Sequence, residues 1–87
     1  MTTVPQGAIG VDRLRELALS ESGFIFDPRT GQSFSANDSA LECLRLLQEG
    51  LSDREIAQRL GLVFERPAEL IEPAVAAFRR QVGRYVQ

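Results

Sequence analysis

The sequence predicts one α+β domain, in which a three-stranded antiparallel sheet is followed by three helices. In the first half of the chain, hydrophobic residues alternate with polar ones or form short runs between turn residues, as in half-buried strands. In the second half they recur every three or four positions, as along one face of an amphipathic helix. The length of 87 residues is near the lower end for a domain that folds without a metal or a disulfide framework.

The first strand is expected after a flexible N-terminal segment, residues 1–12, which holds proline and glycine and shows little periodicity. The folded domain is expected to span residues 13–87. Within residues 15–19, Leu17 and Leu19 alternate with more weakly apolar or charged neighbours. This alternation predicts a half-buried strand.

The strongest local signal is the hairpin turn at residues 27–31. Asp27 can accept hydrogen bonds from the amides of the turn, and Pro28 presets the backbone angle φ of the next position. Gly31 supplies the left-handed conformation that returns the chain. The second strand therefore ends here, after Phe24-Ile25-Phe26, with its two phenylalanines on one side.

The third strand, residues 32–36, is predicted to carry Phe34 inward and its two serines outward. Sheet edges are usually protected by lysine, proline or a bulge, and none of the three is expected in this segment. An unprotected edge of this kind is what strand addition by an extended peptide requires. A covering helix or a second subunit is equally consistent with the pattern.

Two helices are predicted next. Asn37 or Ser39 caps the first, which carries an apolar stripe and ends at Gly50. Ser52 begins the second with a Ser-x-x-Glu capping box. Gly61 is expected to end this second helix, which makes the following Leu-Val-Phe segment a connection.

The last helix is predicted to begin at Pro67, a favourable first position. Pro73 lies inside it and predicts a kink or two separate pieces, because proline removes one backbone hydrogen bond and crowds the preceding turn. Arginines near its end fit either the helix dipole or an electropositive edge for an acidic peptide. Its apolar stripe consists of Ile71, Val75, Phe78, Val82 and Tyr85.

The residue types that catalysis and metal binding need are scarce. The chain has no histidine and a single cysteine, Cys43, which argues against a zinc site, a histidine base or an internal disulfide. Cys43 is expected to be a small buried side chain. The carboxylates, Asp27 included, are interspersed with arginines, as on a solvated surface. We therefore predict no enzyme activity, no cofactor and no metal.

The composition also bears on partners and location. The formal net charge is −2, whereas nucleic-acid-binding proteins usually carry a basic excess. The start of the chain lacks the basic and apolar regions of a signal peptide. No stretch approaches the roughly 18 apolar residues that cross a membrane. We expect a cytoplasmic protein with neither a nucleic-acid nor a membrane partner.

Several of these segments together resemble the PqqD-like family. The hairpin from Gly23 to Asn37 is similar to the hairpin of that family, as are the helix end from Leu44 to Ser52 and the later Glu55-Ile56-Ala57. The similarity covers about residues 17–82. It is greatest to the PqqD-like proteins of HPr-kinase-related systems.

The resemblance implies a winged-helix-like recognition element for ribosomally made, modified peptides. Such domains bind a leader peptide as an added strand along the third strand, in the groove beside the third helix. They present it to a modifying enzyme, a radical-SAM protein in the quinone-cofactor pathway or a protein of the kinase-related system. The positions implied are Gln32, Ser33, Phe34, Ser35 and Ala36 on the strand, and Val75, Phe78, Arg79 and Val82 on the helix.

Three features along this site differ from the family pattern. Ala74 stands where the family often has an aspartate, Pro73 interrupts the helix, and Tyr85-Val86 replaces a double leucine. Two other functions remain open, an adaptor that binds a folded partner and a winged-helix DNA-binding protein. The best DNA-recognition helix, residues 53–60, mixes acidic with basic residues. Two copies of the chain could also pair through the sheet edge as a homodimer.

Overall fold

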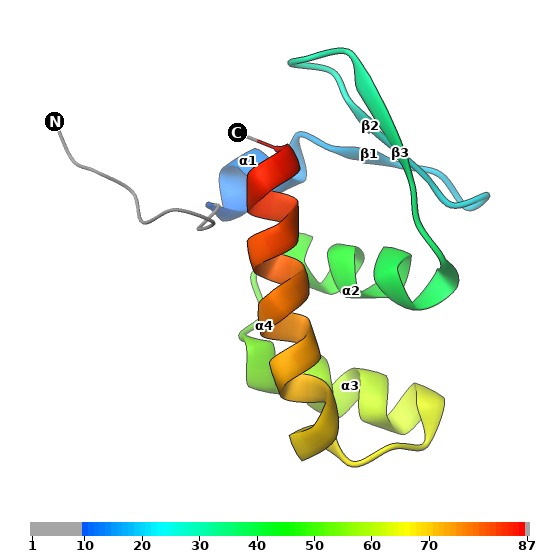
Figure 1. The fold of residues 1–87 in the computed structure, drawn as a ribbon, viewed down its shortest axis with the longest axis vertical. Helices are drawn as coiled ribbons and strands as arrows, with labels where there is room; N and C mark the ends of the chain where they lie inside the picture. The colour runs from blue at the N-terminus through cyan, green and yellow to red at the C-terminus, as the bar shows by residue number, and fades with distance from the viewer. Residues whose placement is uncertain (1–9, 87) are drawn as a thin grey trace, which may run out of the picture.

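The computed structural model describes residues 10–86 and confirms the predicted class, a three-stranded antiparallel sheet followed by three helices. In Figure 1, α4 runs along the long axis, α2 and α3 extend to one side of it, and the sheet lies near its C-terminal end. None of the helices described is long and apolar enough to span a membrane. The elements are α1 (Val11–Arg15), β1 (Ala18–Leu19), β2 (Phe24–Asp27), β3 (Gln32–Ser35), α2 (Asp38–Gln48), α3 (Asp53–Phe64) and α4 (Ala68–Tyr85).

The start of the domain differs from the prediction, because the helix α1 precedes a first strand of only two residues. Leu14 and Leu17 are both buried and lie three positions apart, the spacing of one helical turn. Leu17 is shared by this three-residue spacing and by the two-residue spacing of Leu17 and Leu19. A segment of five residues is too short for the sequence to distinguish the two patterns. The predicted strand at residues 15–19 was therefore too long. Residues 1–9 of the predicted flexible segment lie outside the described residues.

The hairpin has the predicted turn. Gly31 adopts φ +78°, and its N–H donates a hydrogen bond to the Asp27 carbonyl at 2.7 Å. β3 pairs antiparallel with β2 in a register that joins Phe24 to Ser35 and Asp27 to Gln32. The strand order is β1-β2-β3, so β3 is an edge of the sheet.

Asp27 is fully buried, which corrects the prediction that this carboxylate lies on a solvated surface. Arg13 of α1 donates two hydrogen bonds to it, from Nη1 to Oδ1 at 3.1 Å and from Nη2 to Oδ2 at 2.6 Å. The backbone N–H of Arg29 and the hydroxyl of Thr30 donate to the same carboxylate. The hydrogen-bonded Arg13 guanidinium lowers the pKa of Asp27. This ion pair joins α1 to the hairpin.

One of the two residues predicted to cap helix α2 is confirmed. Asn37 is the cap, because its Oδ1 accepts a hydrogen bond from the Ala40 N–H at 2.8 Å. The predicted capping box of α3 is confirmed, with reciprocal hydrogen bonds between Ser52 and Glu55. These two caps fix where both helices start.

Helix α3 continues past Gly61 to Phe64, so the prediction that Gly61 ends it was wrong. Glu65, with φ +55°, follows the last helical residue. A Cβ atom on Gly61 would lie 2.6 Å from the carbonyl oxygen of Arg66. The glycine therefore permits the loop after the helix to approach closely, while the helix itself continues.

Helix α4 is one continuous helix that includes Pro73. Of the two predicted alternatives, a kink or two separate pieces, the second was therefore wrong. Proline removes a single N–H donor, and buried side chains at Val75 and Val82 hold the helix against the core. The core draws on all four helices and on β2. Its most deeply buried aliphatic side chains are Leu14, Leu44, Leu47 and Ile56.

We predict that Gly31→Val lowers the free energy of unfolding by about 1–2 kcal/mol, because a β-branched residue is strained at positive φ. No atom lies within 4 Å of a Cβ built there, so the cost comes from the backbone alone. Gly31→Asn is the matched control, because asparagine tolerates the left-handed region. Chemical denaturation of the three proteins measures the effect, and equal stability of all three would contradict it.

We also predict that acid destabilises the protein through Asp27. The pKa of Asp27 is lower in the folded protein than its ordinary value of 3.8, so its contribution to stability is complete above that pH. The contribution is lost as the pH falls through the folded-state pKa. Melting temperatures measured down to about pH 2 should therefore fall more steeply for the wild type than for Asp27→Asn. Parallel curves would show that Asp27 has no such role.

Candidate functional site

The free edge of the sheet exposes the peptide groups of Ser33 and Ser35. In an antiparallel pair, residues that exchange hydrogen bonds with the neighbouring strand alternate with residues that face away from it. The Ala36 N–H donates to the Gly23 carbonyl at 2.8 Å, one step beyond the Phe24–Ser35 pair. Counting back along β3, Ser35 and Ser33 point away from β2.

The other side of β2 gives the same result. The Ser20 N–H donates to the Phe24 carbonyl at 2.8 Å, so this peptide group faces β1 and its β3 partner, Ser35, receives no bond from it. Phe24 and Phe26 also have exposed side chains on the outer face of the sheet. They lie on one side of the strand, as predicted, and that side faces solvent. Residues 10–86 include no strand beyond β3.

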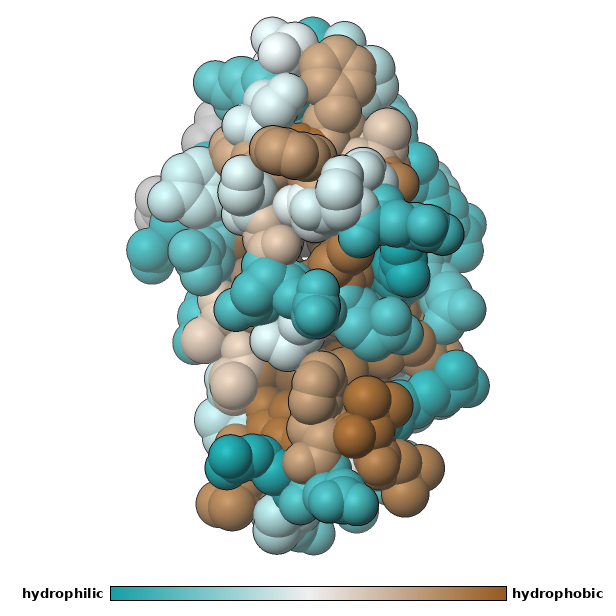
Figure 2. All heavy atoms as spheres, turned by 90° about the vertical axis from the view of Figure 1, so that its right-hand side faces the viewer, coloured by the Kyte–Doolittle hydropathy of each residue, from teal (hydrophilic) through white to brown (hydrophobic). Residues whose placement is uncertain are grey.

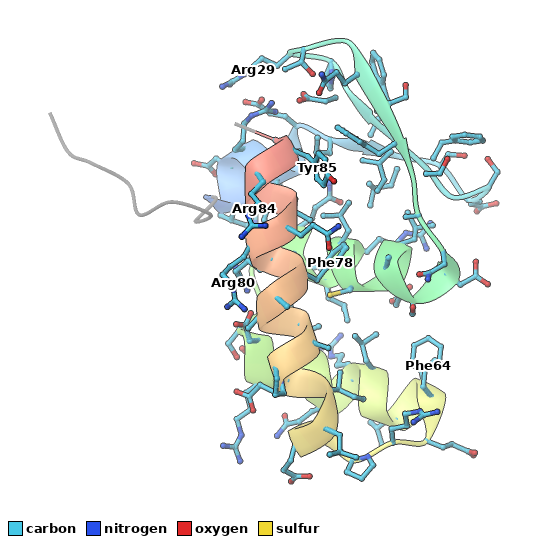
Figure 3. All side chains as sticks on the ribbon, in the orientation of Figure 1. Arg29, Phe64, Phe78, Arg80, Arg84 and Tyr85 are labelled. Carbon is cyan, nitrogen blue, oxygen red and sulfur yellow. The ribbon has the colours of Figure 1, made fainter. Side chains whose placement is uncertain are left out.

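A groove lies between this edge and the last turns of α4, with a volume of about 480 Å³. The ring centroids of Phe34 and Tyr85, which both line this groove, are 5.6 Å apart, and the planes of the two rings are tilted by 54°. Figure 3 shows Phe78 and Tyr85 on the side of α4 that faces the sheet and α2. We call this the edge groove; its main lining residues are Phe34, Ser35, Ala36, Phe78, Val82 and Tyr85.

A second groove, of about 470 Å³, lies between the first turn of α2, the end of α3 and the first half of α4. Figure 3 shows the Phe64 ring above the end of α3, in the space between α3 and α2. The exposed Arg66 also lines this groove. We call it the helix groove; its main apolar lining residues are Cys43, Leu60, Phe64, Ile71, Ala74 and Val75.

Most residues of the predicted peptide site line one of these grooves. Phe34 and Ser35 of β3 line the edge groove, as does Ala36, which directly follows the strand. Gln32 and Ser33 belong to the same strand, and Ser33 contributes the outward-facing peptide group described above. On α4, Val82 lines the edge groove, Val75 the helix groove, and Phe78 both.

Arg79 is the predicted helix residue that lines neither groove. Its Nε donates to the carboxylate of Asp53 at 2.8 Å, and its Nη2 donates to the Leu51 carbonyl at 3.3 Å. In this position it ties α4 to the start of α3.

Tyr85 lines the edge groove. It was expected in the apolar stripe of α4 and as a departure from the family pattern along the site, but not among the peptide-binding residues. The helix groove was not predicted. Placing the end of α3 at Gly61 made Phe64 part of a connection, whereas Phe64 belongs to the last turn of the helix. A prediction that extended α3 to Phe64 would have placed Phe64 and Ile71 at the same end of the molecule.

The chemistry of the grooves suits binding. None of the acidic side chains of residues 10–86 lines either groove, and no cluster of histidine, cysteine and acidic side chains that could hold a metal ion is found in the same range. Cys43 is buried, as predicted. Burial raises the pKa of its thiol to about 11. The surfaces offered to a ligand are therefore mainly apolar side chains and free backbone groups, with the guanidinium of Arg66 in the helix groove.

A family model described as Coenzyme PQQ synthesis protein D (PqqD) matches residues 23–84 of the chain. The matched region runs from the start of the hairpin almost to the end of α4, and it contains β3 and most of both grooves. Helix α1 and strand β1 precede it. Comparisons with curated proteins and with solved structures gave no match.

We predict that Cys43 reacts slowly with thiol reagents in the folded protein. Burial raises its pKa from an ordinary 9.0 to about 11, so near pH 8 its thiolate fraction is roughly 100-fold smaller than that of an unperturbed thiol. The rate of alkylation by iodoacetamide, compared with that of the protein unfolded in denaturant, measures this. Equal rates in the two states would contradict the prediction.

Proposed function

Because the chain belongs to the PqqD family, whose members are non-catalytic peptide chaperones, we propose that it recognises a ribosomally made precursor peptide. It binds the leader part of this peptide as an added strand at β3 and presents the peptide to a modifying enzyme. The family is the chaperone for the PqqA peptide, and it implies a PqqE-like enzyme as the partner. The similarity to HPr-kinase-related systems favours a protein of such a system as an alternative partner.

The outward-facing peptide groups of Ser33 and Ser35 carry the proposal. Each offers one N–H donor and one carbonyl acceptor at an edge that no described residue covers. An extended peptide satisfies both kinds of group at once, and main-chain bonds of this kind give affinity with little dependence on side chains. The small serine side chains leave the backbone accessible.

The edge groove supplies the selectivity that backbone bonds lack. Side chains of an added strand alternate between its two faces, and one of these faces lies over Phe34, Phe78 and Tyr85. Apolar or aromatic peptide residues at every second position fit this surface best. The burial of each apolar side chain contributes roughly 1.5–3 kcal/mol.

Other ligands would use different surfaces. A second copy of the chain would pair with the same edge and form a homodimer, which sedimentation detects. A folded adaptor partner would bind the grooves without strand addition. Duplex DNA would bind at α3, where Asp53 is already paired with Arg79 and acidic residues occupy the first turn.

The ligand for the test is selected from a displayed library of random linear peptides of about 15 residues. An extended chain advances about 3.3 Å per residue, so this length covers the 38 Å long axis of the molecule. The proposal requires enrichment of peptides with apolar residues at alternate positions. A library without enriched peptides, together with tight binding of duplex DNA, would overturn it.

We predict that Ser33→Pro and Ser35→Pro each weaken binding of a selected peptide at least tenfold, roughly the 1–3 kcal/mol cost of leaving a buried polar partner unbonded. Proline removes the outward N–H, and an edge strand tolerates proline at such positions. Ser33→Thr and Ser35→Thr keep the N–H and are expected to bind almost as the wild type does. Fluorescence anisotropy measures the affinities, and circular dichroism checks that each variant is folded.

The position of the peptide is checked by NMR. Amide shifts caused by the peptide should be largest at residues 32–36 and on the groove side of α4. Shifts that cluster at residues 53–60, with residues 32–36 unaffected, would contradict strand addition.

A further inference from the structure

We infer that the helix groove is a second subsite of the peptide-binding surface. It binds an apolar side chain of the peptide just beyond the segment paired with β3, and Arg66 binds a peptide carboxylate beside it. This inference rests on the proposed function. It adds a requirement that strand addition alone does not impose, namely an apolar and acidic flank on one side of the paired segment.

The two grooves adjoin. Asn37, Ala40 and Phe78 line both of them, so the boundary between the two spaces consists of these shared residues. β3 leads through Ala36 directly into Asn37, which caps α2. A peptide that leaves the sheet edge at Ser35 therefore arrives at the opening of the helix groove.

The helix groove has the shape and surface of an apolar side-chain pocket. Its base contains the buried Leu60 and Val75 and the half-buried Ile71. Ala74 is exposed and small, so α4 leaves space where a larger side chain would fill the groove. Phe64, 41% exposed, lines the groove from the end of α3. Figure 2 shows hydrophobic side chains at the level of the sheet and again at the lower end of this face, where α3 and α4 meet.

Arg66 gives the groove one positive charge. It is exposed, and none of the ion pairs found among residues 10–86 involves it. Its backbone N–H donates to the Gly61 carbonyl at 3.0 Å, which fixes the loop that carries it. Because the groove has no acidic lining residue of its own, a peptide carboxylate is the complementary partner for this guanidinium.

The test fills the groove without altering the sheet edge. Ala74→Trp places a large side chain where the helix groove is lined by a methyl group. The matched control is Ala77→Trp, because Ala77 is an exposed residue of α4 that lines neither groove. The ligand is a peptide selected from the random library, together with two versions shortened from either end. We expect Ala74→Trp to weaken binding of the full peptide at least about tenfold, which is roughly 1.4 kcal/mol. Ala77→Trp is expected to leave it unchanged.

The shortened peptides locate the flank. The version that lacks the flank should bind the wild type more weakly than the full peptide does. It should bind the wild type and Ala74→Trp with the same affinity, because neither of these complexes uses the helix groove. The version shortened from the other end should keep its sensitivity to Ala74→Trp. Equal sensitivity of all three peptides to Ala74→Trp would overturn the inference, since it would indicate a general change in the protein.

Arg66→Glu tests the charge and serves as a second variant if Ala74→Trp does not fold. It should weaken binding of a full peptide with an acidic flank, and the loss should be smaller at high salt because exposed charges are screened. Binding unaffected by Arg66→Glu and by Ala74→Trp overturns the subsite. If Ser35→Pro still abolishes binding, strand addition stands without it; if Ser35→Pro also has no effect, the proposed function itself fails.

Discussion

The buried ion pair between Arg13 and Asp27 is the contact on which the position of the hairpin depends. The sheet is small, and its strands pack mainly on one another, so few contacts connect it to the helices. Arg13 belongs to α1, which is in turn tied to the end of α2 because Gln48 donates hydrogen bonds to the carbonyls of Leu14 and Leu17. Removing one partner of a buried ion pair leaves an uncompensated charge. The pair therefore fixes the hairpin relative to the helical layer, and with it the width of the edge groove.

A fixed hairpin also explains how an open edge can persist. Unprotected edge strands promote association with other chains, and short length is one of the ways in which proteins limit this. β3 has four residues, and the tilted contact between Phe34 and Tyr85 covers part of its inner face. The edge is therefore accessible over a short stretch that ends at α2. Such a short strand leaves little surface for a continuing sheet, which is compatible with the proposed pairing of one extended peptide.

Local signals in the sequence predicted the parts of the fold that local interactions determine. The turn at Gly31 and the capping box at Ser52 each depend on residues within a few positions, and both were found. Contacts between distant residues determined what was missed. Asp27 is buried because Arg13 reaches it from a helix of five residues, and Gly61 is needed because the loop carbonyl of Arg66 passes close to it. Of the predicted site residues, Phe34, Ser35 and Ala36 and most of those on α4 line the grooves. Arg79 instead pairs with Asp53, a contact between two helices that periodicity does not reveal.

Continuity of α4 is what makes the two grooves parts of one surface. A break at Pro73 would have separated Ile71 and Ala74 from Phe78 and Val82, and each half of the helix could then have moved independently. In the continuous helix these residues lie on one side at successive turns, so the spacing between the sheet edge and the helix groove is fixed. A ligand that occupies both spaces must match that spacing, which restricts its sequence more than either groove does alone. Selectivity of this kind suits a member of a family of non-catalytic peptide chaperones.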